Sequence, residues 1–117
     1  MIFETHAHYD DERFTSDREA LLASLSDCGI KRVVNVGASI DTTRNSIQLA
    51  ENYEFIYAAV GVHPSDIGEL DEAQFTWLKE QTKHPKAVAV GEIGLDYYWE
   101  KELEVQEKQR YWFKRQL

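Results

Sequence analysis

The strongest constraint on the fold is an apolar, β-like run that recurs four times along the chain. The runs cover residues 2–8, 32–38, 55–63 and 86–95, at about the 30-residue spacing of βαβ units. The middle runs are continuous stretches of Val, Ala and Ile, which is typical of parallel strands covered on both faces. The sequence therefore predicts an α/β protein with four parallel strands.

Each run is followed by a helical pattern of apolar residues. The expected N-terminal caps of the first three helices are Ser16, Ser39 or Asp41, and Asp71. Gly29 and Pro85 are expected to end the first and third helices. The last helix is expected from about residue 101 to the end, with its apolar side formed by Leu103, Val105 or Gln106, Trp112 and Phe113.

Length and charge narrow the class of protein. The chain has 117 residues, the size of one small domain, and no apolar run approaches the roughly 20 residues of a membrane span. No basic flank precedes an apolar core at the N-terminus, so we expect no secretory signal and a cytoplasmic protein. The net charge of −8 argues against binding nucleic acid through a broad basic surface. The single cysteine, Cys28, permits no internal disulfide and is expected to pack near a helix end.

Two histidines stand at the end of the first run, in the stretch ETHAH. Alternate side chains of a strand share one face, so His6 and His8 are expected to point the same way. Two neutral imidazoles in that arrangement can hold one divalent metal ion. The pair alone is a weak signal, because two histidines without a metal would give the same pattern.

A carboxylate interrupts the fourth run, in the stretch VAVGEIGLDYY. An unpaired Glu92 would be costly in a buried strand, although a glutamate that reaches solvent from a strand end would give the same pattern. With two histidines it can complete a metal site, or it can bridge two cations that activate a water and clamp a phosphate. The C-terminal ends of parallel strands carry the chemistry in barrels, which favours His6, His8 and Glu92 as metal ligands.

Three other polar residues give less specific signals. His63 follows the third run in VGVHP, where it could contact substrate or a water of the metal site, or stabilise its own loop. Asp96 could bond a ligand or an arginine near the site, but capping or bonding within its loop is expected, and His84 is expected to lie on the solvated surface. The chain has no phosphate-binding P-loop, no dinucleotide fingerprint and no GxSxG elbow.

The motifs ETHAHYDD, VGVHP and VGEIGLDYYWE, in this order and with these gaps, resemble the N-terminal half of the TatD family of metal-dependent hydrolases. The closing segment YWFKRQL resembles the family segment that follows, so the likeness covers essentially the whole chain. The family's fold is a TIM-type (β/α) barrel, and its members are divalent-metal-dependent deoxyribonucleases, several of them 3′-to-5′ exonucleases. The resemblance implies that residues 1–117 are the N-terminal half of such a barrel domain, with only its first four βα units.

The resemblance also implies the site residues. The family's first metal pair matches His6 and His8, and its bridging carboxylate matches Glu92, which we expect to be catalytic together with His63. The implied cofactors are divalent metal ions, two in a complete site, with Mg, Mn or Zn as candidates. The implied substrate is DNA, whose phosphodiester bonds are cleaved by a metal-activated water. Glu4 stands where the family often has Asp.

A complete barrel of this type has eight strands in about 250 residues, and the family supplies two more histidines and an aspartate from later strands. Four strands leave two bare edges and an open apolar inner face. We therefore expect the isolated chain to self-associate, to aggregate, or to be a truncated product that is incomplete as an enzyme. Two other hypotheses remain: an amidohydrolase-like enzyme for amides, esters or phosphotriesters, and an inactive fragment that acts only by assembly.

Overall fold

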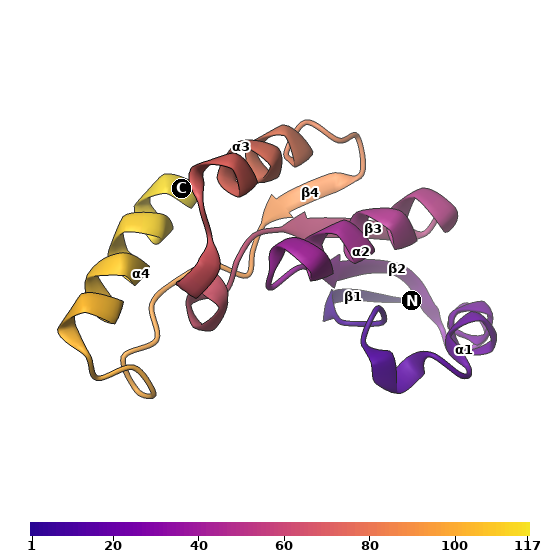
Figure 1. The fold of residues 1–117 in the computed structure, drawn as a ribbon. Coiled ribbons are helices and arrows are strands. Elements are labelled where there is room, and N and C mark those ends of the chain that lie inside the picture. The colour runs from indigo at the N-terminus through magenta and orange to yellow at the C-terminus, as the bar shows by residue number, and fades with distance from the viewer.

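A sheet of four parallel strands forms the centre of the computed structural model, which describes residues 1–117. The strands lie in chain order, β1 (Ile2–Ala7), β2 (Ile30–Val36), β3 (Ile56–Val60) and β4 (Ala87–Val90). Helices connect them, as Figure 1 shows. This confirms the predicted α/β fold with four parallel strands, although β4 ends before the predicted limit of residue 95.

Three helices lie on one face of the sheet, α1 (Arg18–Ser24), α2 (Ile40–Asn52) and α3 (Glu72–Gln81). The last helix, α4 (Leu103–Gln116), lies beyond the C-terminal ends of the strands and packs against the 3-10 helix η2 (Pro64–Glu69) (Figure 1). A second 3-10 helix, η1 (Glu12–Phe14), follows β1. The core contains residues from all four α-helices and from β2 and β3, among them Leu22, Val33, Ile47, Val60, Leu78 and Trp112. None of these helices is both long enough and apolar enough to cross a membrane.

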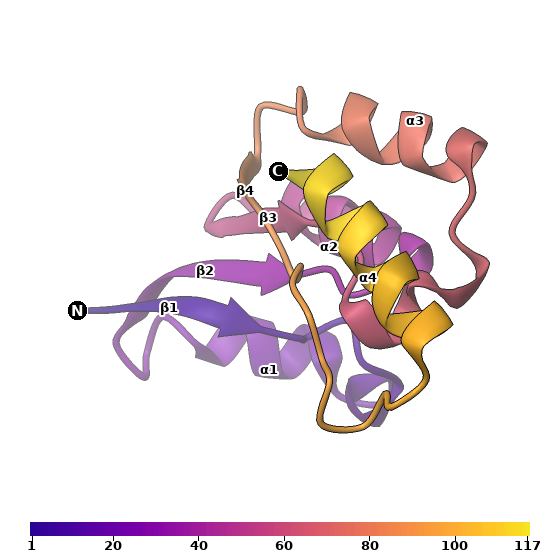
Figure 2. The same ribbon diagram turned by 90° about the vertical axis from the view of Figure 1, so that its left-hand side faces the viewer.

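The opposite face of the sheet is open to solvent. Its middle carries a small buried cluster of Val34, Val36 and Ala59, but no helix packs over it. At its two edges Phe3 of β1 is 58% exposed and Val88 of β4 is 54% exposed. The prediction that the middle strands are covered on both faces is wrong, because helices lie on one face only. The inner face is open, as expected for four strands of a barrel, and its edge strands are uncovered (Figure 2).

The N-terminal caps agree with two of the three predictions. Ser39 caps α2 through the N–H of Thr42, and Asp71 caps α3 through the N–H of Gln74, each in a reciprocal capping box. The prediction of Ser16 as a cap is wrong. Residues 15–17 form a turn, whereas a capping residue needs an extended backbone, and α1 begins without a side-chain cap.

Helix α4 differs from the prediction in its buried side. Leu103 is 65% exposed, whereas Gln109 and Gln116 are buried. The Gln116 amide accepts the N–H of Val62 (2.8 Å) and donates to the carbonyl of Val62 (3.1 Å). Gln109 pairs in the same way with both backbone groups of Asp96 (2.8 and 3.2 Å). A fully paired amide can be buried at little cost, so the polarity pattern was misleading here.

Two side chains near helix ends lie differently from their predictions. Cys28 is exposed rather than packed. The half-buried His84 is not a solvated surface residue, because its Nδ1 accepts the N–H of Lys86 (3.1 Å) and its Nε2 lies 3.1 Å from Oε1 of Glu51. An accepting Nδ1 leaves the proton of the neutral ring on Nε2, which can donate to the carboxylate. His84 therefore ties the start of β4 to the end of α2.

Replacing Lys86 by Met should destabilise the protein by about 1–2 kcal/mol. The ammonium donates to the carbonyls of Ala50 (2.7 Å), in the last turn of α2, and of Tyr53 (2.7 Å) and Glu54 (3.0 Å), which follow the helix. Burial lowers the pKa of this ammonium, as expected for a group held against the protein. Urea unfolding measures the effect. Lys83→Met is the matched control, because Lys83 forms only an exposed pair with Glu80, and an equal loss in both variants would contradict the prediction.

The contribution of Glu72 to stability should disappear in acid. Hydrogen bonds from Arg115 and then from Tyr111 lower the pKa of the Glu72 carboxyl below its ordinary value of 4.5. The folded protein thus binds this proton more weakly than the unfolded chain. The stabilisation is complete above the unfolded pKa and is lost as the pH falls through the folded one. Urea unfolding of the protein and of Glu72→Gln should differ near neutral pH and converge in acid; a constant difference would contradict this.

Candidate metal centre

The three predicted metal ligands meet at the C-terminal end of the sheet. His6 lies in β1, His8 follows that strand, and Glu92 follows β4. Oε1 of Glu92 lies 2.6 Å from Nε2 of His6 and 3.7 Å from Nε2 of His8, and the two ring nitrogens are 3.1 Å apart. Ligand atoms of all three residues lie within 4.8 Å of one another. The structure thus brings together residues that are 86 positions apart in the chain (92 − 6).

A β-bulge in β1 determines which face of the sheet receives the histidines. Three steps along β1, from Glu4 to Ala7, match only two steps along β2. The extra residue shifts the alternation of side chains, so the neighbours Thr5 and His6 both line the open face. His6 and His8 point to one place, as the sequence predicted. Simple alternation alone would not have placed both His6 and Thr5 on this face.

The ring of His8 is held in the tautomer that suits a metal ligand. Its Nδ1 lies 2.9 Å from the carbonyl oxygen of Val36, and a carbonyl can only accept. Nδ1 therefore carries the proton, and the lone pair of Nε2 faces Glu92 and His6. A backbone partner of this kind fixes the orientation of metal-binding histidines.

The backbone around Glu92 is fixed by the ends of two other strands. Gly91 donates its N–H to the carbonyl of Val60 (2.9 Å), and Glu92 donates its N–H to the carbonyl of Gly37 (2.6 Å). Gly61 lies against the backbone of Gly91, since a Cβ atom at position 61 would be 2.7 Å from the carbonyl carbon of Gly91. The close approach requires glycine at position 61 and directs Glu92 toward the histidines.

The donor set fits a divalent metal ion. Tetrahedral ligands about 2.0–2.2 Å from one ion lie roughly 3.3–3.5 Å from one another. Two of the three donor separations, 3.1 and 3.7 Å, are close to these values, whereas the 2.6 Å between Nε2 of His6 and Oε1 of Glu92 is a direct hydrogen-bond distance. Two imidazoles and a carboxylate suit Zn, Mn or Fe, and three protein ligands leave a coordination position free for chemistry.

The site lies at one end of a hollow of about 640 Å³ on the open face of the sheet. His6 and Glu92 line it together with inner-face residues such as Phe3, Val36 and Val90. The metal ligands therefore have an apolar wall on one side.

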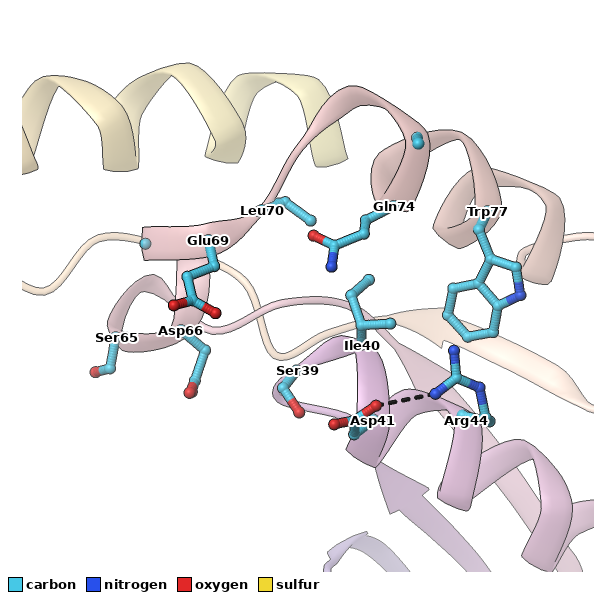
Figure 3. A pocket seen from close by; sticks show the side chains of 12 residues that line it. Ser39, Ile40, Asp41, Arg44, Ser65, Asp66, Glu69, Leu70, Gln74 and Trp77 are labelled. Carbon is cyan, nitrogen blue, oxygen red and sulfur yellow. Dashed lines mark hydrogen bonds and ion pairs between the residues drawn. The ribbon is translucent and has the colours of Figure 1, made fainter.

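A second hollow, of about 670 Å³, lies between the start of α2, η2 and α3. Figure 3 shows Arg44 paired with Asp41 (2.9 Å), and its guanidinium lies 5.1 Å from the ring centroid of Trp77. The cation of this hollow is therefore already engaged by a carboxylate and an aromatic ring. None of the three predicted metal ligands lines it, so the candidate chemistry belongs to the hollow of the open face.

His63 is not one of the three clustered residues, but it follows β3 at the same end of the sheet. Its N–H donates to the carbonyl of Ala38 (2.8 Å), and its Nδ1 accepts the N–H of Ser65 (3.1 Å) at the start of η2. The neutral ring therefore carries its proton on Nε2. Gln116 of α4 holds the preceding residue, Val62, by both backbone groups. His63 thus stabilises its own loop, one of the two predicted possibilities, and offers an N–H donor.

Asn35 is a supporting residue that the sequence analysis missed. It is fully buried in β2, and its Oδ1 accepts the N–H of Tyr9 (2.6 Å). Its Nδ2 donates to Asp10 (2.8 Å) and to Ser46 (2.8 Å). The amide thereby fixes the chain directly after His8. An asparagine inside the apolar run RVVNVGA was the signal, because a buried amide requires partners.

Comparison with known proteins identifies the family. The family model described as TatD related DNase matches residues 3–117. An uncharacterized metal-dependent hydrolase of Bacillus subtilis, YabD, is 41% identical over 101 residues, which cover 86% of this chain and 40% of the relative. The 3'-5' ssDNA/RNA exonuclease TatD of Escherichia coli is 27% identical over 96 residues, which cover 82% of this chain and 37% of that protein.

A solved structure agrees with the sequence relatives. The crystal structure of YjjV, a TatD homologue from Escherichia coli, superposes with a TM-score of 0.85 at 30% identity, covering 98% of this chain and 44% of YjjV. The chain thus spans less than half the length of the proteins it matches, and its four strands correspond to part of a TIM barrel. The match along almost the whole chain shows that this protein belongs to the TatD family of metal-dependent hydrolases.

Proposed function

We propose that this chain supplies the first metal ligands of a hydrolase that cleaves phosphodiester bonds of single-stranded DNA from the 3′ end. The observation that carries the proposal is the convergence of His6, His8 and Glu92 at the C-terminal end of the parallel sheet. The exonuclease name of the Escherichia coli TatD protein supports the substrate class. The cytoplasmic location stays a prediction.

In this proposal His6 and His8 bind through Nε2, and Glu92 binds through Oε1. When bound, divalent ions lower the pKa of a water and neutralise charge that develops on the phosphoryl oxygens. The second carboxylate oxygen of Glu92 can accept a proton from the attacking water, which gives Glu92 both metal-binding and catalytic roles. Mg, Mn and Zn are all candidates, and the imidazole-rich donor set favours Zn among them.

We assign His63 a role as a hydrogen-bond donor to the substrate. Its Nδ1 is occupied by the N–H of Ser65, so its Nε2–H is the group that it presents at the end of the sheet. A donor at this place suits a phosphate oxygen, which has only acceptors to offer. With Nδ1 occupied and Nε2 protonated, the ring as placed has no free lone pair for a metal.

The acidic composition agrees with a site in which bound metal ions, and not a basic protein surface, contact the phosphates. A net charge of −8 would repel a polyphosphate unless cations lay between protein and substrate. Bound divalent ions supply that charge locally, so a broad basic surface is not needed.

Digestion of a 5′-labelled single-stranded oligodeoxynucleotide tests the proposal, with Mg, Mn and Zn compared separately. We expect stepwise shortening from the 3′ end that requires metal and falls at least about 100-fold in Glu92→Gln. The double-stranded oligonucleotide is the substrate control. Cleavage without metal, or cleavage unchanged in Glu92→Gln, would contradict the proposal. Hydrolysis of small esters with intact DNA would favour the amidohydrolase-like alternative.

We also propose that a second copy of the chain covers the open face. All four strands are parallel, so a twofold axis along them would pair β4 of each copy with β1 of the other and close eight strands. The same axis would bring a second set of His6, His8 and Glu92 to the same end. Light scattering should give twice the 13.6 kDa of one chain. Val88→Glu should reduce this mass to that of a monomer, and a folded monomer in the parent would contradict the arrangement.

A further inference from the structure

The segment that follows Glu92 presents two aromatic rings to solvent. We call residues 95–101, between Gly94 and α4, the aromatic loop. In it Tyr98 is 72% exposed and Trp99 is 74% exposed, and their rings meet edge to face with centroids 4.7 Å apart. Aromatic rings of this size normally contribute to stability by being buried, so rings this exposed in an ordered loop are available to contact a ligand.

The aromatic loop is a fixed structure rather than a loose connection. Its start is held by the buried Gln109, which pairs with both backbone groups of Asp96. The Asp96 carboxylate in turn accepts the N–H groups of Tyr98 (3.1 Å) and Trp99 (3.3 Å). These bonds confirm the prediction that Asp96 bonds within its loop. They also orient the backbone that carries the two rings.

Two cationic side chains contact the tyrosines of the aromatic loop. Lys101 donates to the carbonyl of Tyr97 (2.9 Å), and its ammonium lies 5.5 Å from the ring centroid of Tyr98. Arg110 of α4 donates to the hydroxyl of Tyr97 (2.9 Å). A cation over the ring of Tyr98 is a favourable contact on one side of that ring. The exposed surface of Trp99 has no cation partner and faces solvent.

The aromatic loop lies on the side of the molecule where the candidate metal centre opens. Figures 1 and 2 show the chain passing from the end of β4 beyond the C-terminal ends of β1 and β2 before it turns into α4. Trp99 is seven residues after Glu92 (99 − 92), a reach of at most about 25 Å for an extended chain. A polymeric substrate held at Glu92 can therefore extend to these rings.

We propose that Tyr98 and Trp99 form a stacking platform for the unpaired bases of a single-stranded nucleic acid. The inference rests on the proposed function and names the part of the substrate that the loop contacts. Each base offers a flat π-face, so stacking on aromatic side chains binds single strands with little dependence on sequence. Bases in a duplex are already stacked, and the platform selects against them.

The charges around the loop favour stacking over phosphate binding. Asp96, Glu100 and Glu102 place carboxylates in or next to the aromatic loop, and the contacting cations are Lys101 and Arg110. Phosphates are therefore directed to the metal centre, and bases to the rings. Each phosphate neutralised on a single strand contributes about 0.7 to the slope of log K against log salt. Because two cations can neutralise two phosphates, log K for binding at this platform should fall with log salt with a slope no steeper than about −1.4.

Binding of a fluorescein-labelled oligodeoxythymidylate with phosphorothioate linkages, in the presence of Mg²⁺, tests the platform with hydrolysis suppressed. The whole chain is used, and anisotropy reports the Kd. Replacing both Tyr98 and Trp99 by Ala should raise the Kd about 10-fold or more. Leu103→Ala is the matched control, because it removes an exposed apolar side chain beside the loop and should leave the Kd unchanged. Trp99→Phe keeps a stacking ring and should retain most of the binding.

The outcomes separate this inference from the proposed function. A Kd unchanged by the double substitution, or no measurable binding by the parent chain, would overturn the platform. Loss of binding together with a change in mass by light scattering would assign the rings to a contact between chains and would also overturn it. Tight binding that depends on the rings, with no metal-dependent cleavage, would keep the platform and contradict the hydrolase proposal.

Discussion

Replacing His6 and His8 by Ala should abolish binding of divalent metal to this chain. Two of the three donor atoms in the cluster disappear, and Glu92 alone offers one carboxylate at a partly exposed position. Loss of a group that merely supports a metal ligand raises the Kd about 10- to 100-fold, so loss of two ligands should exceed 100-fold. Isothermal titration calorimetry with Zn²⁺ or Mn²⁺ measures the change.

His84→Ala is the matched control for that titration. His84 is the other histidine for which the structure shows a carboxylate partner, Glu51, and it lies in the segment before β4 rather than at the C-terminal end of the sheet. Its replacement should leave the metal Kd unchanged while urea unfolding detects a loss of stability. Equal losses of metal affinity in the two variants would mean that the metal binds to histidines in general and not to this cluster.

Replacing Gly61 by Ala should weaken metal binding and destabilise the fold together. The new Cβ atom would lie 2.7 Å from the carbonyl carbon of Gly91 and 2.8 Å from its carbonyl oxygen. Both contacts are with the backbone of Gly91, so the segment that carries Glu92 must move. Overpacking of this kind costs about 1–3 kcal/mol. Because Glu92 follows Gly91 directly, the shift should also raise the metal Kd. Urea unfolding and the same calorimetric titration measure the two effects.

Gly68→Ala supplies the control for the Gly61 substitution. A Cβ atom at Gly68 meets nothing within 4 Å, and the residue is exposed in η2. We expect its stability and its metal Kd to stay close to those of the parent. If Gly61→Ala bound metal as tightly as Gly68→Ala does, the close approach at Gly61 would not be what positions Glu92.

Local sequence patterns were sufficient for the elements and for the identity of the candidate ligands. The spacing of four apolar runs predicted four parallel strands, and the motifs around His6, His8 and Glu92 predicted three side chains that the structure brings within 4.8 Å. These signals are local, because strand and helix periodicity and N-terminal caps such as Ser39 and Asp71 depend on residues a few positions apart.

The tertiary structure decided the features that depend on distant partners. Gln109 and Gln116 are buried because each amide pairs with both backbone groups of a residue in another segment. The spacing of apolar residues in the sequence does not predict such a pair. His84 is paired rather than freely solvated for the same reason, since its partner Glu51 is 33 residues away. The face reached by His6 follows from an extra residue in the β1–β2 register. The sequence by itself thus identified which groups are the candidate metal ligands. Only the packed chain decided where they point, because side-chain direction depends on register and on contacts between segments far apart in sequence.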